Sequence, residues 1–195
     1  LSREIARRFN QMYCGVADTV ADADHVKAGG LFPIPEAITG RVKRLVGIKG
    51  PNKEGQLLKM SKSLNNAILL SDGPDVVQKK VMSMYTDPTR LKATDPGQVK
   101  NNPLWIFHDT FNPDHSWVEE TKELYKAGKI GDVVCKKQLI EVINTLLAPM
   151  HARRARYSAD KAQLIALLKK AQEEALAISH QTLDRVLELT KQRMF

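Results

Sequence analysis

Residues 59–63 are the part of this 195-residue sequence whose residue types and spacing are best suited to chemistry. They read KMSKS, from Lys59 through Met60, Ser61 and Lys62 to Ser63. Two ammonium groups three positions apart can approach a polyphosphate from different sides, and the two hydroxyls add short-range donors. Met60 supplies a polarizable apolar contact for the face of a base. The pattern indicates a phosphate-binding loop, although composition alone favours a solvated surface loop.

Three further stretches turn this pattern into a family resemblance. The pentapeptide matches all five letters of the KMSKS signature of class I aminoacyl-tRNA synthetases. Residues 79–88, 131–133 and 149–154 resemble, in order and spacing, the C-terminal half of bacterial tryptophanyl-tRNA synthetases. Residues 3–10 are similar to the helix that follows the Gly-Asp/Thr-Asp-Gln segment of that family's active site. The resemblance extends over essentially the whole chain.

The resemblance implies an ATP-dependent ligase. Such an enzyme activates tryptophan as an aminoacyl-adenylate, releases pyrophosphate, and transfers the aminoacyl group to the terminal ribose of its tRNA. ATP with Mg²⁺ is then a substrate, and no metal or prosthetic group is expected to be held by these residues. The implied partners are tryptophan-specific tRNA, ATP, tryptophan bound through an N-terminal half, and a second copy of the full-length enzyme. A cytoplasmic location without membrane contact is expected.

The same resemblance assigns roles to residues of the loop. Lys59 and Lys62 are the expected catalytic residues, because they would neutralise the departing phosphates, and Lys62 is expected to have the larger effect. No general acid or base is required, since the carboxylate of the amino acid is itself the nucleophile and Mg²⁺ shares the phosphate charge. Adenine would touch Met60 and either Leu45 or Val46. The expected ATP contacts are Leu45, Val46, Lys59, Met60, Ser61, Lys62 and Ser63.

Other signatures of the family do not occur in this sequence. The His-Ile-Gly-His-like motif that holds ATP is absent, and so is the Gly-Asp-Gln segment. The sequence opens on Leu1, inside an expected amphipathic helix, so we expect a C-terminal fragment that is inactive by itself. Two alternatives stay open, a non-catalytic tRNA-binding fragment and a tyrosyl-type class I synthetase. Residues 79–88 and 131–133 speak against the tyrosyl type.

The residue patterns on both sides of the loop predict a mainly α fold that positions it. Residues 1–71 are expected to be the C-terminal remnant of a Rossmann-like α/β nucleotide-binding domain that includes the KMSKS loop. This region begins with an amphipathic helix and contains two short strand-like apolar runs, at residues 31–38 and 45–48. Residues 72–195 are expected to be a helical anticodon-binding domain.

Capping signals and apolar periodicity place the helices of the second region. Asp72 is the expected N-cap of the first, and Gly128 closes the third. The last would be about 50 Å long if it continued unbroken to Met194, and a bend near residues 179–180 is an alternative. The expected helices cover about 72–87, 103–111, 116–127, a range from Asp132 onward, and a range from about Ala159 onward.

Basic side chains in the second region supply the expected RNA contacts. A rigid helix holds such side chains at fixed separations, and unpaired bases are read on such a frame by stacking and edge contacts. The alternative is a solvated face on which the arginines pair with neighbouring carboxylates. The net charge of +8 suits a polyanionic partner and suits solubility equally well. The candidates are Lys136, Lys137, Arg153, Arg154 and Arg156.

The remaining composition narrows the other possibilities. With 43% hydrophobic and 27% charged residues, the sequence predicts a soluble globular protein with real cores, and no apolar run is long enough to span a bilayer. Two distant cysteines, Cys14 and Cys135, indicate neither a disulfide framework nor a zinc site. Trp105 is expected to be core rather than a base-stacking platform. No metal ligands are assigned, and residues 22–25 are expected to be exposed turn residues.

Overall fold

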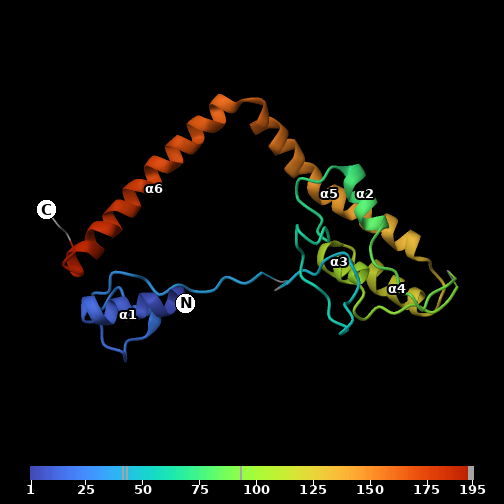
Figure 1. The fold of residues 1–195 in the computed structure, drawn as a ribbon, viewed down its shortest axis with the longest axis horizontal. Coiled ribbons are helices and arrows are strands. Elements are labelled where there is room, and N and C mark those ends of the chain that lie inside the picture. The colour runs from blue at the N-terminus through green and yellow to red at the C-terminus, as the bar shows by residue number, and fades with distance from the viewer. Residues whose placement is uncertain (41, 43, 93, 193–195) are drawn as a thin grey trace. The chain divides into compact units, whose positions relative to one another are not determined.

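A computed structural model describes residues 1–40, 42, 44–92 and 94–192. This part of the chain is mainly helical and contains no β-strand (Figure 1). Its contacts divide the chain into two compact units, Leu1–Thr39 with Asp160–Phe195, and Gly40–Ala159. The helices are α1 (Ser2–Cys14), α2 (Pro74–Met82), α3 (Pro103–Phe111), α4 (His115–Lys126), α5 (Asp132–Ala159) and α6 (Lys161–Leu189), with a short 3₁₀ helix η1 (Asp22–Asp24).

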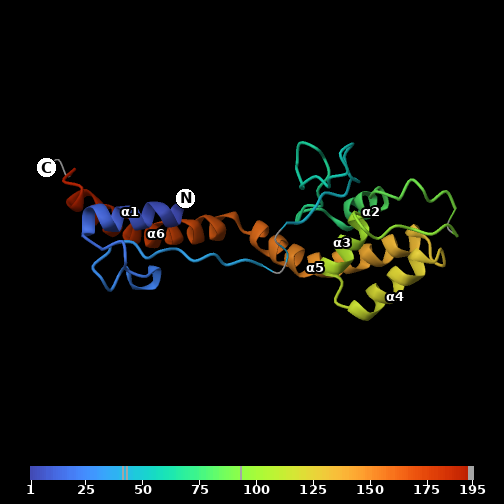
Figure 2. The same cartoon turned by 90° about the horizontal axis from the view of Figure 1, so that it is seen from below.

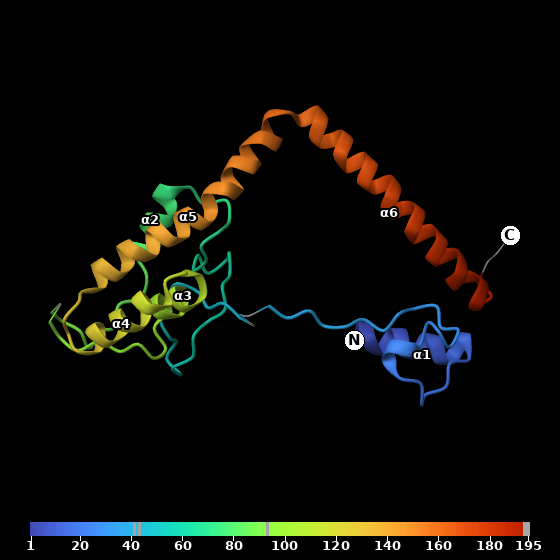
Figure 3. The same ribbon diagram turned by 180° about the vertical axis from the view of Figure 1, so that it is seen from behind.

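In the first unit, α1 is the amphipathic helix expected at the start of the sequence. It ends at Gly15, whose positive φ of 72° favours glycine. The chain that follows folds back against α1 (Figure 3). Asn10 fixes this return, since its buried side chain donates to the carbonyl of Phe32 at 2.7 Å and accepts from the Phe32 N–H at 3.0 Å.

Residues 22–25 have structural partners within the first unit. Asp22 accepts two hydrogen bonds from the guanidinium of Arg7, at 2.7 and 2.6 Å. Asp24 is exposed, as expected, and pairs with Lys27. The expectation of an exposed turn is wrong for His25, which is buried and lies 3.3 Å from the Asn10 amide.

Helix α6 begins where Asp160 accepts a hydrogen bond from the N–H of Gln163. It continues without interruption through residues 179–180, so the alternative of a bend there is wrong (Figure 1). The helix ends at Leu189, and the expected extension to Met194 lies outside the described residues. No residue of α6, all of which are described, is buried.

The second unit is built on α5, which packs against α2 and α3, while α3 also packs against α4 (Figure 2). Trp105 is 1% exposed, which confirms its expected place in the core. The fully enclosed core is formed by Val77, Val81, Leu104, Trp105, Phe107, Tyr125, Cys135 and Leu139. Among the described residues, no helix is long and apolar enough to cross a membrane.

Most of the helix signals in this unit are confirmed. Asn102 caps α3 directly before Pro103, and Gly128 follows α4 with a φ of 68°. The expected N-cap of α2 is wrong, because Gly73 takes that position. The carboxylate of Asp72 instead accepts from the N–H of Leu69 at 2.8 Å and pairs with Lys80 at 2.6 Å.

The strand-like runs at 31–38 and 45–48 form no strand in the part of the chain that the structure describes. Val46 pairs with Lys59 in one isolated antiparallel bridge. A strand needs a neighbour along its length, and two prolines in the first run remove the N–H groups that a ladder requires. Ile48 instead belongs to the core of the helical unit. Residues 44–71 therefore pack with the helices of the second unit. The expected domain boundary at residues 71/72 stays a prediction.

Asp132, which lies in one of the stretches that carried the family resemblance, takes part in a largely buried polar cluster with Arg90 and Tyr125. The guanidinium of Arg90 lies 4.3 Å from the centre of the Tyr125 ring and donates to Asp132 at 3.1 Å. The Tyr125 hydroxyl donates to the same carboxylate at 2.8 Å. Burial raises the pKa of the Tyr125 hydroxyl, with Asp132 adding to the shift. Asp132 is therefore a structural partner of Arg90 and of Tyr125 on α4.

Candidate functional site

The KMSKS loop is held at its base by backbone contacts within the second unit. The Val46–Lys59 bridge brings the segment before the loop beside its first lysine. The N–H of Gly47 donates to the carbonyl of Leu58 at 2.9 Å. On the far side of the loop, the carbonyl of Asn66 accepts from the N–H of Ile48 at 2.8 Å. Both ends of the loop are thereby fixed to residues 46–48.

The tip of the loop, residues 62–65, is exposed. The N–H of Asn65 donates to the carbonyl of Lys62 at 3.1 Å, and Asn65 has a φ of 46°. Asparagine tolerates this left-handed conformation better than most residues. The hydroxyls of Ser61 and Ser63 lie 2.8 Å apart, within hydrogen-bond distance of each other.

The ammonium groups of Lys59 and Lys62 are exposed, and none of the ion pairs among the described residues includes either of them. Lys62 borders two hollows in the surface. One, of about 150 Å³, is also lined by Ser61, Asn65 and Lys80. The other, of about 410 Å³, extends to Arg154 on α5. Cations beside open space are suited to an anionic ligand.

The segment after the loop is anchored to α2 and to α5. The ammonium of Lys80 donates to the carbonyl of Ala67 at 2.8 Å while it pairs with Asp72. On α5, Nε2 of His151 donates to the carbonyl of Leu70 at 3.1 Å. These contacts hold residues 67–72 against both helices.

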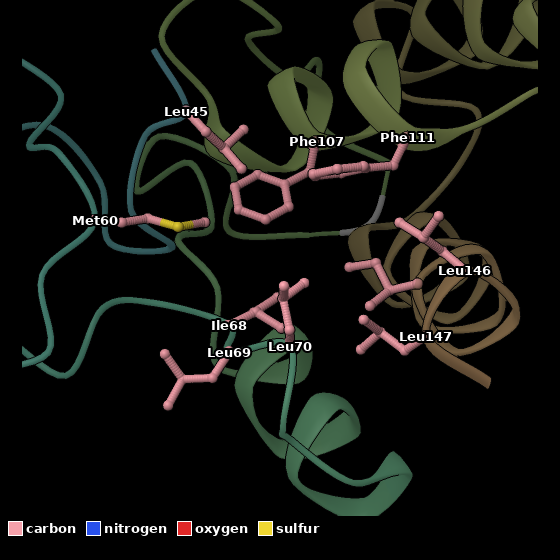
Figure 4. Close-up of a pocket in the computed structure, with 10 residues that line it drawn as sticks. Leu45, Met60, Ile68, Leu69, Leu70, Phe107, Phe111, Leu146 and Leu147 are labelled. Atoms are coloured by element: carbon pink, nitrogen blue, oxygen red, sulfur yellow. The ribbon is translucent and has the colours of Figure 1, made fainter. Parts of the chain in front are cut away.

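An apolar pocket of about 270 Å³ lies next to the loop (Figure 4). Leu45 and Met60, two of the expected adenine contacts, line it together. Val46 is not among the lining residues, although it packs against the core as Leu45 and Met60 do. The pocket is lined by Leu45, Met60, Ile68, Leu69, Leu70, Phe107, Phe111, Ile143, Leu146 and Leu147.

Four of the five expected RNA contacts are exposed on α5. Lys137 lies near the start of the helix, and Arg153, Arg154 and Arg156 lie near its end. Helix α5 continues through Pro149, so this basic cluster is carried on a helix that is packed in the core through its first half. Arg156 lies over the ring of Tyr157, 4.9 Å from its centre.

The expectation that Lys136 contacts RNA is contradicted by its position. Its side chain is buried, and its ammonium donates to the carbonyls of Met82 and Met84 and to the hydroxyl of Thr86, at 3.1, 2.7 and 3.0 Å. Burial lowers the pKa of Lys136, and the carboxylate of Asp132 partly opposes this. Lys136 therefore closes the C-terminal end of α2 and does not face a ligand.

Sequence reasoning missed three residues of the site. Asn66 has the residue type of a turn former and is fully buried under the loop. Lys80 and His151 lie in stretches used for the family resemblance, where Lys80 has no predicted role and His151 belongs to a basic cluster considered for RNA contact. No sequence signal distinguishes such anchoring residues from exposed ones, because each is polar and lies outside an apolar repeat. Among the described residues, no group of three or more potential metal ligands was found.

Comparison with known proteins places this site in a family. The family model for class I tRNA synthetases of the W and Y type matches residues 1–148. The chain belongs to this family.

The curated relatives narrow the comparison to one branch. The tryptophan–tRNA ligase of Borreliella burgdorferi is 44% identical over 164 residues, which cover 84% of this chain and 41% of that protein. The enzyme of the same name from Treponema pallidum is 40% identical over 188 residues, covering 96% and 50%. The chain thus spans about half the length of the curated relatives it matches.

A solved structure supports the fold alone. Tryptophanyl-tRNA synthetase from Campylobacter jejuni, in complex with ADP and tryptophan, superimposes with a TM-score of 0.66 at 24% identity. The match covers 95% of this chain and 51% of that one.

Proposed function

We propose that this chain forms the C-terminal half of a tryptophan–tRNA ligase, with the KMSKS loop acting on ATP and the basic end of α5 acting on tRNA. The observation that carries the proposal is the position of Lys59 and Lys62 on an anchored loop. Both ammonium groups are exposed and stand outside the ion pairs of the described residues. The names of the curated relatives support the choice of tryptophan.

In the proposed reaction, the carboxylate of tryptophan attacks the α-phosphorus of ATP. The bond from that phosphorus to the bridging oxygen breaks, and its electron pair leaves with pyrophosphate. Lys59 and Lys62 offset the charge that grows on the leaving group, which stabilises the transition state more than bound ATP. Mg²⁺ would enter as part of the substrate, bound to the phosphates. Ser61 and Ser63 would donate from the same loop.

The apolar pocket supports a contact with adenine. Leu45 and Met60 lie on its wall, side by side with the phosphate-binding loop (Figure 4). An apolar wall suits the face of a purine ring and leaves its polar edge to other groups. Val46 does not line the pocket, and we propose that it acts through its backbone bridge with Lys59.

The two functional regions remain as inferred from the sequence. Residues 1–71 would complete a Rossmann-like nucleotide-binding domain, and residues 72–195 would form the anticodon-binding domain. The partners would be tRNA, ATP, tryptophan and a second copy of the full-length enzyme, in the cytoplasm. Among the expected RNA contacts, Lys137, Arg153, Arg154 and Arg156 stay in the proposal, since they are exposed.

The test of the proposal is Lys62→Ala in the full-length protein. We expect tryptophan-dependent ATP–pyrophosphate exchange to slow by about a hundredfold or more, because one preorganised donor to the leaving group is removed. The KM for tryptophan should change little, since the change affects the transition state more than the ground state.

Lys53→Ala is the matched control for this measurement. Lys53 is an exposed lysine of the preceding loop, and its replacement removes the same charge. Its exchange rate should stay close to wild type. An unchanged rate in Lys62→Ala would refute the role of the loop. Exchange that depends on tyrosine rather than tryptophan would favour the tyrosyl type, which the same family model includes.

A further inference from the structure

Asn66 is fully buried although the loop residues directly before it are exposed. Turn-forming asparagines are usually solvated, and burying a primary amide is unfavourable unless its donors and acceptor are bonded. The position therefore calls for a role beyond turn formation.

The side chain of Asn66 bonds the backbone on both sides of Met60. Its Oδ1 accepts from the N–H of Ser61 at 2.7 Å, and its Nδ2 donates to the carbonyl of Lys59 at 3.2 Å. The backbone carbonyl of Asn66 accepts from Ile48, which belongs to the core. One residue thus connects the first half of the KMSKS loop to the interior of the unit.

Gly47 leaves the space that this arrangement needs. A Cβ added at Gly47 would lie 2.6 Å from Cγ of Asn66 and would also meet its amide nitrogen. The side chain of Asn66 is short and enclosed, so it cannot move aside without breaking its bonds to the loop. The requirement for glycine here comes from packing.

We propose that Asn66 is a positioning residue for Lys59 at the base of the KMSKS loop, and that Gly47 is glycine because a larger residue would displace the amide of Asn66. This inference rests on the proposed function of the loop. The amide of Asn66 fixes the backbone at Lys59 and Ser61, whereas the tip from residue 62 to residue 65 has no bond to that amide. Lys59 is therefore held by a buried amide. Lys62 is held only by exposed contacts of the tip, from the N–H of Asn65 to its own carbonyl at 3.1 Å and from Lys49 to the carbonyl of Leu64 at 2.9 Å.

Two variants of the full-length protein test this geometry, Asn66→Ala and Gly47→Ala. The first removes the amide, and the second displaces it while leaving Asn66 in the sequence. Trypsin cleaves after lysine, so the ratio of cleavage after Lys59 to cleavage after Lys62, measured by mass spectrometry, reports the local order of the loop. In the wild type this ratio should be low, because the Lys59 carbonyl is bonded to the buried amide of Asn66, whereas the Lys62 carbonyl is bonded only to Asn65 of the exposed tip. In both variants it should rise several-fold, roughly 5-fold or more if the base becomes as mobile as the tip.

The same variants are assayed for pyrophosphate exchange after active-site titration. The rate should fall by about 10- to 100-fold, because displacing a catalytic group by about 1 Å has an effect of that size. The KM for tryptophan should change less than about 2-fold, since the loop acts on the leaving group. This division between kcat and KM would not follow from a loss of folded protein.

Matched controls separate the loop from general destabilisation. Asn112→Ala removes another buried asparagine of the same unit, which bonds His108 and the N–H of Asp114. Gly73→Ala adds a Cβ where nothing lies within 4 Å. Both controls should keep the wild-type cleavage ratio, whatever their effect on stability.

Each outcome decides one question. An unchanged cleavage ratio in Asn66→Ala and Gly47→Ala overturns the positioning role, whatever the rate. A raised ratio in Asn112→Ala also overturns it, because the ratio would then follow stability rather than the loop. A raised ratio confined to the two test variants, with an unchanged exchange rate, supports the positioning role and refutes the proposed function of the loop in pyrophosphate release. A raised ratio with a lowered rate supports both.

Discussion

Lys136 and Lys137 are adjacent on α5 and have opposite environments. The first is buried with its ammonium bonded to three oxygens, and the second is exposed. Neighbouring residues of a helix point about 100° apart, so adjacent identical side chains can have unrelated roles. Replacing each lysine in turn therefore compares a lysine with a structural role and a lysine proposed to bind RNA within one helical turn.

Lys136→Met is expected to destabilise the protein by about 1–3 kcal/mol, because the carbonyls of Met82 and Met84 lose their buried donor. Lys137→Met should stay within about 0.5 kcal/mol, as surface substitutions usually do. The measurement is the urea midpoint of the full-length variants. If Lys136→Met lowered tRNA affinity without any loss of stability, the sequence-based role of Lys136 would be restored.

The chemistry of individual residues could be predicted only where a motif named them. Lys59 and Lys62 were identified because the five letters occur together, and the structure leaves both exposed. The burial of Asn66 and Lys136 could not be predicted, since both are polar and their partners are mostly backbone carbonyls and N–H groups. Nearly every residue type has the same backbone N–H and carbonyl, so the sequence does not indicate which of them a buried side chain will bond. Only the structure shows these partners.

At the scale of elements, α5 carries the basic cluster out of the core. Its first half contacts α2 and α3, and its last turns are exposed. A helix that is fixed at one end holds the cations at the other end at set separations. The ion pairs among the described residues include neither Arg153 nor Arg154, so the structure shows no carboxylate partner for them, and their contact with RNA stays a prediction.

Replacing Arg153 and Arg154 by alanine is expected to weaken tRNA binding and to flatten its salt dependence. For each phosphate that is no longer neutralised, the slope of log K against log salt should become shallower by about 0.7–0.9. The control is Lys27→Ala with Lys126→Ala, which removes the same charge from two cations that lie in ion pairs. If the slope of log K against log salt were equal in both double variants, the arginines would be assigned to a solvated face.

The helices were predictable because their signals are local. Pro103 with Asn102, Gly128 and the apolar stripe of α1 mark ends and faces within a few residues. The strand-like runs failed because a strand depends on a partner elsewhere in the chain, and the described residues provide a single bridge between Val46 and Lys59. The N-cap of α2 failed by one residue, since Asp72 bonds Lys80 instead of a helix N–H.

On the scale of the whole molecule, the 195-residue chain spans about half of its curated relatives. We expect this chain alone to show no tryptophan-dependent pyrophosphate exchange, because its residues include no His-Ile-Gly-His-like motif to hold ATP. The full-length protein assayed under the same conditions is the control, and circular dichroism checks that the short chain is helical. Measurable exchange by the short chain would mean that the loop acts without those residues.

The hydrogen bond from His151 to Leu70 would couple the two activities that we propose for this chain. His151 precedes the arginine cluster by two residues, and Leu70 follows the KMSKS loop by seven. Any shift of this turn of α5 on RNA binding would displace the backbone at Leu70, in the segment that follows the KMSKS loop. RNA binding and amino-acid activation would then be coupled through the backbone carbonyl of Leu70.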